Sequence, residues 1–423
     1  MNFNIFNKSE KFSERAASNV ELSLLALTLF CLPLYEAPKN IFSILFLLVW
    51  AFQSWKSKSL GGSSPFDLPI LVLALVLWVS PFFSGFSSFV SPLDSAPRWS
   101  LLALFVLSSS RLNYTERQLM VIWGALMMGG IYAVIDSFYQ WDPDYKNYPE
   151  FRSVGHVNHS SMYSLIPLAA GLGALKMRDY WFKCLGLLSI FSTIVFLPAS
   201  RSIVGLVSVL FIVTFSFIII FLRGRSWIYK INFVFLFLFS VSFLFLLPQF
   251  ADLRDEIRSD ILSGDIFSGR LGILNSALAV WDKHPFIGTG WNSFGVATSR
   301  EVVQHALNDS GIAYSAGRYQ HAPHGHNLFV NILIERGLVG VVMVATLLLL
   351  YFKTFLPIAW RLGEIDRTDV GSALSVVLVA LGFAVAGLGN TTMMNEHGHA
   401  GMAFISVAYG YLRGRGLLPY KPD

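Results

Sequence analysis

Residues 328–352 read LFVNILIERGLVGVVMVATLLLLYF, an apolar run long enough to cross a membrane as a helix. A membrane-spanning helix needs roughly 20 mainly apolar residues. The rest of the chain has the same character, since 54% of its 423 residues are hydrophobic, only 13% are charged, and its mean hydropathy is +0.57. This composition excludes a soluble domain of ordinary makeup.

Other segments of similar length and apolar content bring the total to about twelve predicted spans. Hydrocarbon offers no hydrogen-bonding partners, so only helices or closed barrels can cross it, and long apolar runs without strict alternation favour helices. We therefore predict an all-α polytopic membrane protein with one membrane domain over residues 1–423. The predicted spans are 19–35, 38–54, 66–84, 97–110, 117–137, 159–176, 181–199, 202–222, 231–248, 328–352, 369–389 and 399–414.

Positive charge predicts the orientation, because short cytoplasmic loops carry an excess of Lys and Arg. More than half of the 31 Lys and Arg residues fall inside the cell when both termini are placed there. The formal net charge of +5 follows largely from this bias, so no nucleic-acid partner is needed to explain it. The long segment 250–325, between the ninth and tenth predicted spans, then forms a large outer loop.

Three imidazoles, those of His321, His324 and His326, lie within six residues where the outer loop re-enters the membrane. Imidazole is a good zinc ligand, so a metal site is one interpretation. Because no cysteine is near and Asp309 is the nearest upstream carboxylate, we expect no metal. A general base fits better, since a neutral histidine with a pKa near the working pH can take a proton from an attacking hydroxyl.

Two arginines are candidates for binding an anion. Arg201 lies in a short outer loop against the positive-inside preference, which favours anion binding over a structural ion pair. Arg270 lies at the start of a helix-like run over residues 268–281, where its guanidinium and the helix N-terminal amides could hold a phosphate. A side chain that reaches up to lipid headgroups is an equally good interpretation of Arg270.

Two further patterns have structural interpretations. The sequence PFIGTG at residues 285–290 contains a Gly-x-Gly, which alone is a weak phosphate signal and here favours a tight turn. His156, His159, His397 and His399 lie at predicted outer membrane edges. They could line a sugar or headgroup site, but capping of helix starts is the favoured interpretation.

Residues 326–340 resemble the signature of the bacterial O-antigen ligases, which is a His followed by Asn, Ser or Gln, nine residues, and then Gly-x-x-Gly/Thr/Tyr. His326, Asn327, Gly337 and Gly340 match every motif position. The turn at 285–290 is similar to the Pro-x-x-Gly-x-Gly turn of the O-antigen ligase and polymerase superfamily. The resemblance covers about residues 268–340 and also Arg201, because Arg201 and Arg270 fit the placements of two family arginines.

The resemblance implies a GT-C-like glycosyltransferase of a bacterial inner membrane with its site on the periplasmic face. The donor would be an O-antigen chain on undecaprenyl diphosphate, and the acceptor would be the lipid A-core oligosaccharide. His326 would act as general base, Arg201 and Arg270 would bind the diphosphate, and His321 and His324 could contact substrate. No metal or other cofactor would be required, and inversion follows if base and leaving group lie on opposite faces of the sugar.

Three alternatives stay open. O-antigen polymerases and bacterial protein O-oligosaccharyltransferases share the architecture and the donor. The latter usually carry a longer C-terminal region, whereas this sequence stops at Asp423 soon after its last predicted span, so the ligase is favoured. A transporter that binds a lipid diphosphate through outer arginines is a different class, and it would need no base.

Overall fold

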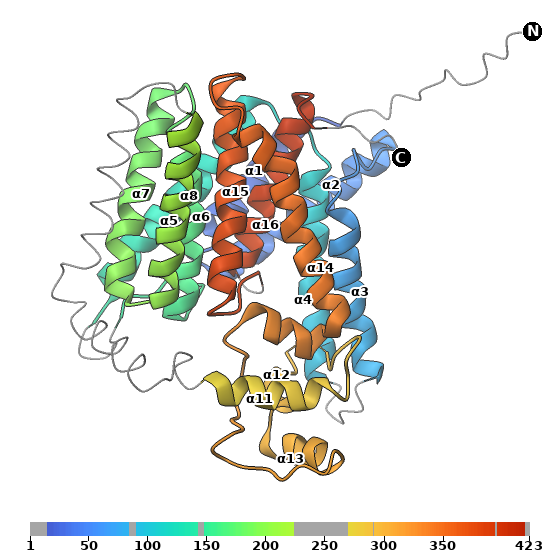
Figure 1. Ribbon diagram of the computed structural model, residues 1–423. Coiled ribbons are helices and arrows are strands. Elements are labelled where there is room, and N and C mark those ends of the chain that lie inside the picture. The colour runs from blue at the N-terminus through green and yellow to red at the C-terminus, as the bar shows by residue number, and fades with distance from the viewer. Residues whose placement is uncertain are drawn as a thin grey trace, which may run out of the picture.

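The computed structural model describes residues 15–83, 90–142, 148–223, 270–290, 292–393 and 396–418. The regular secondary structure within these ranges is helical, apart from one isolated β-bridge between Ala16 and Asn113. Most helices stand side by side in a bundle, and three short ones lie beyond one of its ends (Figure 1). The helices are α1 (Asn19–Cys31), α2 (Glu36–Ser57), α3 (Asp67–Phe83), α4 (Val90–Ser110), α5 (Glu116–Gln140), α6 (Val157–Ala174), α7 (Tyr180–Ser200), α8 (Ile203–Arg223), α11 (Arg270–Trp281), α12 (Phe294–Ala297), α13 (Arg300–Asn308), α14 (Leu328–Ala359), α15 (Arg367–Gly387) and α16 (Glu396–Gly414).

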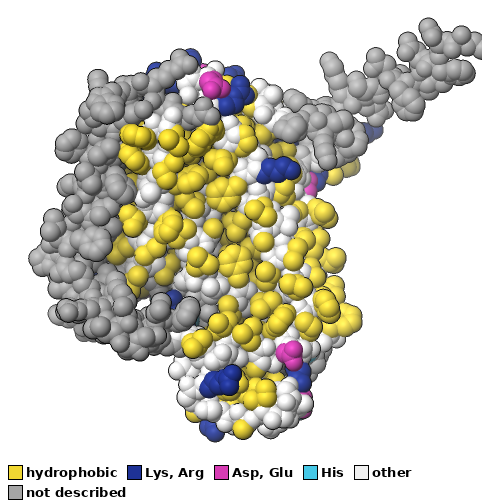
Figure 2. Space-filling model, viewed as in Figure 1, with side chains coloured by type: hydrophobic (Ala, Val, Ile, Leu, Met, Phe, Trp, Pro, Cys, Tyr) yellow, Lys and Arg dark blue, Asp and Glu magenta, His cyan; other side chains and the backbone are white. Residues whose placement is uncertain are grey.

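The helices of the bundle overlap the predicted spans, with ends that differ by up to seven residues; the ninth predicted span, 231–248, lies outside the described residues. Six of them, α2, α5, α7, α8, α14 and α15, are long and apolar enough to cross a membrane. Hydrophobic side chains cover the visible side of the bundle, while most of the visible Lys, Arg, Asp and Glu residues lie toward its ends (Figure 2). An all-helical, multi-pass membrane protein is the architecture that such surfaces allow.

The two ends of the bundle differ. At one, which we call the terminal end, the described chain both begins and ends (Figure 1). Helix connections there hold basic residues that the charge rule placed inside the cell. Arg413 donates hydrogen bonds to the Asn113 side chain and the Gly62 carbonyl, and Arg178 lies 3.0 Å from Asp366. At the opposite end, which we call the loop end, residues 270–327 enter α14.

The short helices α11, α12 and α13 form a small group with its own apolar core at the loop end. Helix α11 confirms the helix expected over residues 268–281, of which the structure describes residues 270–281. Ile334 of α14 belongs to this second core, so the first turns of α14 pack against the loop helices. The core consists of Ala277, Val280, Phe294, Ala297, Val303, Leu307, Tyr319 and Ile334.

Helix α14 is not the continuous span that the sequence suggested, because it is broken at Gly337 (φ 62°, ψ −163°). The turn at residues 285–290 fills the break with backbone hydrogen bonds. Thr289 and Gly290 donate to the carbonyls of Ile334 and Glu335, at 2.8 and 2.9 Å. On the other side, the amides of residues 338 and 339 donate to the carbonyls of residues 285 and 286, at 2.8 and 3.1 Å. The predicted structural role of this turn is therefore confirmed.

Close packing accounts for the glycines of the motif. A Cβ on Gly337 would lie 2.3 Å from the carbonyl carbon and oxygen of Phe286. A Cβ on Gly340 would lie 2.4 Å from Cβ of Arg336, whose buried guanidinium stands 4.5 Å from the ring centroid of Trp99. Both glycines thus serve packing at the junction of the loop helices and α14.

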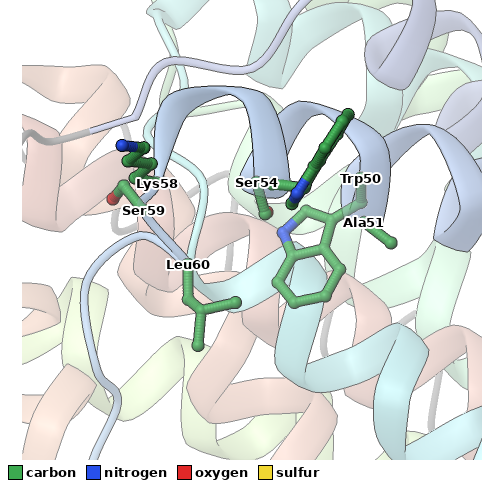
Figure 3. A pocket seen from close by; sticks show the side chains of 7 residues that line it. Trp50, Ala51, Ser54, Lys58, Ser59 and Leu60 are labelled. Carbon is green, nitrogen blue, oxygen red and sulfur yellow. The ribbon is translucent and has the colours of Figure 1, made fainter.

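A cavity of about 410 Å³ lies at the terminal end of α2 (Figure 3). Trp50, Ser54, Trp55 and Lys58 are among the residues that line it. It is separated by the length of the bundle from the histidines that precede α14, so it does not belong to the site described below.

Candidate active site

His326 occupies a tight turn directly before α14. Its φ of 47° is left-handed, a conformation that is uncommon outside glycine, is more frequent for His, Asn and Asp, and clusters at functional sites. The next residue, Asn327, caps α14 by accepting from the amides of Phe329 and Val330, at 2.9 and 3.1 Å. The sequence His-Asn therefore places the imidazole at a fixed position at the helix start.

A polar chain inside the protein holds this turn. The side-chain oxygen of Asn331 accepts from the amide of Gly325, at 3.1 Å. Asn331 also hydrogen-bonds the buried carboxylate of Glu335, which in turn accepts from the amides of Asn292 and Phe294. The backbone next to His326 is thus connected to the start of α12 through two buried side chains.

Arg270, the first residue of α11, reaches the same turn as the motif asparagine. Its Nη1 donates to the carbonyl of Gly389, at 3.1 Å, and Nδ2 of Asn327 donates to the neighbouring carbonyl of Leu388, at 2.9 Å. Both carbonyls belong to the turn that follows α15. The structure therefore brings Arg270, in the predicted outer loop, close to His326, which directly follows that loop, and Arg270 lowers the pKa of His326.

The electrostatic environment keeps both central histidines neutral near pH 7. Burial lowers the pKa of His326 to about 4, and His324, Arg270 and His156 add to this effect. The pKa of His324 is lowered as well, mainly by burial, with contributions from His156 and Arg270. The two rings are close, with centroids 4.1 Å apart. His326 can thus accept a proton, although its pKa lies below the near-neutral value that the sequence suggested.

Arg201 lies at the loop end in the turn between α7 and α8. It ends α7 with a left-handed φ of 49°, and its exposed guanidinium stands 5.9 Å from the ring centroid of Tyr148. Its neighbour Ser202 donates to the side chain of Asn158, at 2.9 Å. The Arg201 turn is therefore attached to the start of α6, which carries His156 and His159.

His321 is set apart from the other two loop histidines. Its exposed ring places Nδ1 3.3 Å from the carbonyl of Thr298, at the end of α12. The three imidazoles that are close in sequence therefore divide into a pair, His324 and His326, and a single ring on the loop helices. In the described part of the chain, no group of three His, Cys, Asp or Glu residues is arranged to hold a metal ion.

The histidines at the helix starts are closer to this pair than the sequence could indicate. His156 is the N-cap of α6 and accepts from the amide of Asn158, at 3.1 Å, so the capping interpretation is confirmed for this residue. The rings of His156 and His159 are 5.6 Å apart, and those of His159 and His397 are 5.4 Å apart. His399 instead packs edge-on against Phe105, at 4.8 Å.

Comparison with known protein families gives a match over part of the chain. Residues 187–345 match the family described as O-Antigen ligase. The matched region includes Arg201, Arg270 and the whole motif from His326 to Gly340. Among curated proteins, no match to the chain was found. The family match and the motif that it contains make this region of the chain similar to the O-antigen ligases and support the O-antigen ligase superfamily for the protein.

Proposed function

We propose that this protein is an O-antigen ligase that transfers the glycan from undecaprenyl diphosphate to the lipid A-core oligosaccharide. The observation that carries the proposal is that Arg270 and Asn327, the residue next to His326, bind the same turn at the loop end, and that Arg270 and His326 both lie in the region that matches the family. Members of this family are glycosyltransferase-like enzymes, and this chemistry needs an anion-binding group beside a base.

The arginines act on the leaving group. As the bond from the anomeric carbon to the phosphate oxygen breaks, negative charge grows on the lipid diphosphate, and guanidinium groups stabilise it. A guanidinium carries five N–H donors, of which Arg270 gives one to Gly389. Its other donors can therefore serve a phosphate. Arg201, exposed beside Tyr148 at the same end of the bundle, provides the second charge.

His326 acts on the acceptor. Its neutral ring takes the proton of the acceptor hydroxyl as the oxygen forms the new bond to the anomeric carbon. Attack on the face opposite the leaving diphosphate gives inversion in one displacement. A diphosphate bound at Arg270 also offsets the positive charge that lowers the pKa of His326, so the pKa rises in the substrate complex and the base becomes stronger. His324 and His321 are proposed substrate contacts.

The proposed orientation has both termini in the cytoplasm and the site on the periplasmic face of the inner membrane. Basic residues at the terminal end, such as Arg178 in a short connection and Arg413 in the last turn of α16, support this orientation. We further propose that residues 1–423 form one membrane domain, of which the 250–325 loop carries part of the active site.

The acceptor distinguishes the ligase from its relatives. Purified protein is mixed with undecaprenyl-diphosphate glycan and, in separate reactions, with lipid A-core, a second lipid-linked glycan or an acceptor protein. Product with lipid A-core alone supports the ligase, whereas product with either of the others supports the polymerase or the protein O-oligosaccharyltransferase. A lipid-diphosphate transporter would give no glycosyl product and would keep its function in His326→Ala.

A further inference from the structure

The starts of α6 and α16 bring a second group of histidines to the loop end. We call His156, His159 and His397 the histidine row. Their ring centroids follow one another at 5.6 and 5.4 Å. The row comes from two helices that are far apart in the sequence, and none of its members belongs to the motif before α14.

The histidine row adjoins the candidate active site. His156 is near enough to His324 and His326 to lower the pKa of both. His159 interacts electrostatically with the same two residues. A substrate held between Arg270 and His326 would therefore extend toward the row on one side.

Hydrogen bonds determine which ring nitrogens carry protons. Nδ1 of His156 accepts from the amide of Asn158, so the proton of the neutral ring is on Nε2, which becomes a donor. Nε2 of His397 lies 3.1 Å from the carbonyl of Thr391, which can only accept, so this nitrogen donates. Nδ1 of His397 is then an acceptor, and it is buried with no hydrogen-bond partner among the described residues. The row thus combines donors with acceptors.

Two described cations at this end of the bundle are paired with carboxylates, whereas Arg201 lies nearer the start of α6. Lys39, on α2, lies 2.5 Å from Glu396 and 3.5 Å from Glu36. Arg152 lies 3.1 Å from Asp136. The far end of the row is therefore unsuited to a phosphate, in contrast to the Arg270 side. Imidazole rings that donate through one nitrogen and accept through the other match hydroxyl groups, which do the same.

We propose that the histidine row is a sugar-binding subsite, in which His156 and His159 hydrogen-bond ring hydroxyls of a glycan and His397 positions His159. This inference rests on the proposed transferase function, because it assigns the row to the sugar beside the reacting bond. The sugar belongs either to the donor glycan or to the acceptor oligosaccharide, and both present the same hydroxyl chemistry.

Steady-state kinetics on the full chain test the proposal. His159→Ala and His156→Asn are compared with the wild type, with each substrate varied in turn; Asn at position 156 keeps a good helix cap. Loss of a hydrogen bond to a sugar raises KM for one substrate about tenfold, with a smaller change in kcat. The substrate affected identifies the sugar. His159→Asn, which can donate and accept, should recover part of the loss, and His305→Ala on α13 should behave as the wild type.

A binding measurement separates this inference from the proposed function. The affinity of His326→Ala for core oligosaccharide and for lipid-linked glycan is measured by calorimetry, with and without His159→Ala. About tenfold weaker binding of one glycan supports the subsite even if no transfer is detected. Unchanged KM values and unchanged affinities for both glycans in a folded His159→Ala protein would overturn it.

Discussion

Replacing Gly337 with alanine tests how the candidate site is held together. The backbone there adopts φ 62° and ψ −163°, a region essentially restricted to glycine, and an alanine would cost about 1–3 kcal/mol in backbone strain. Its Cβ would also lie 2.3 Å from backbone atoms of Phe286. Because these atoms belong to the backbone, the 285–290 turn has to move away from α14.

Moving the turn breaks the four backbone hydrogen bonds across the break, each of which contributes about 1 kcal/mol net. With the backbone strain, the structure around the junction loses roughly 5–7 kcal/mol. The turn follows α11, so its displacement separates Arg270 from His326. We expect a lower unfolding temperature and at least about a 100-fold loss of transfer, since each 1.36 kcal/mol in the barrier is tenfold in rate.

The control is Gly363→Ala. Gly363 also has a positive φ, of 87°, but a Cβ there would have open space around it, so only backbone strain of about 1 kcal/mol is expected. Unfolding in detergent, followed by tryptophan fluorescence, and glycan transfer are measured for both variants. If Gly337→Ala unfolds and transfers like Gly363→Ala, the account of the junction is wrong.

Three further variants or conditions test the site. Arg270→Ala should lower kcat/KM about 100- to 1,000-fold. Arg270→Lys should lower it less, because lysine keeps the positive charge but lacks the planar set of donors. A kcat/KM of Arg270→Ala equal to that of the wild type would contradict diphosphate binding. Asn331→Leu leaves the Gly325 amide unsatisfied and should lower transfer about tenfold or more in a folded protein, whereas full activity would show that the turn holds without it. The pKa of about 4 keeps His326 neutral above about pH 5, so kcat/KM should fall only below this pH. The value of kcat should begin to fall at a higher pH, because the bound diphosphate raises the pKa of His326 in the substrate complex. A fall of kcat/KM centred near pH 6.5 would contradict the burial of the ring.

The sequence predicted the positions of the helices well and their interruptions poorly. Long apolar runs determine where a span lies, because length and hydropathy act locally. The break in α14 depends on an unusual conformation at Gly337 that only the distant turn at 285–290 stabilises. A glycine inside an apolar run indicates a special backbone, but it does not identify the segment that contacts it.

The candidate site, too, was predicted in part from the sequence and in part not. The motif and the start of α11 located His326 and Arg270, and in the structure Arg270 and the neighbour of His326, Asn327, bind the same turn after α15. Sequence proximity grouped His321 with the pair, yet its ring contacts Thr298 instead. From the sequence, helix capping was the favoured interpretation of the histidine row and a sugar or headgroup site the alternative; the pairing of the rings could not be predicted, since it depends on how α6 and α16 pack.

The central claim is that His326 is the base of a glycosyl transfer assisted by Arg270. The most direct test is transfer from undecaprenyl-diphosphate glycan to lipid A-core by purified protein in the presence of EDTA. We expect product from the wild type and almost none from folded His326→Ala or Arg270→Ala. Equal product from His326→Ala would contradict the assignment of the base, and loss of wild-type product in EDTA would contradict a metal-independent reaction.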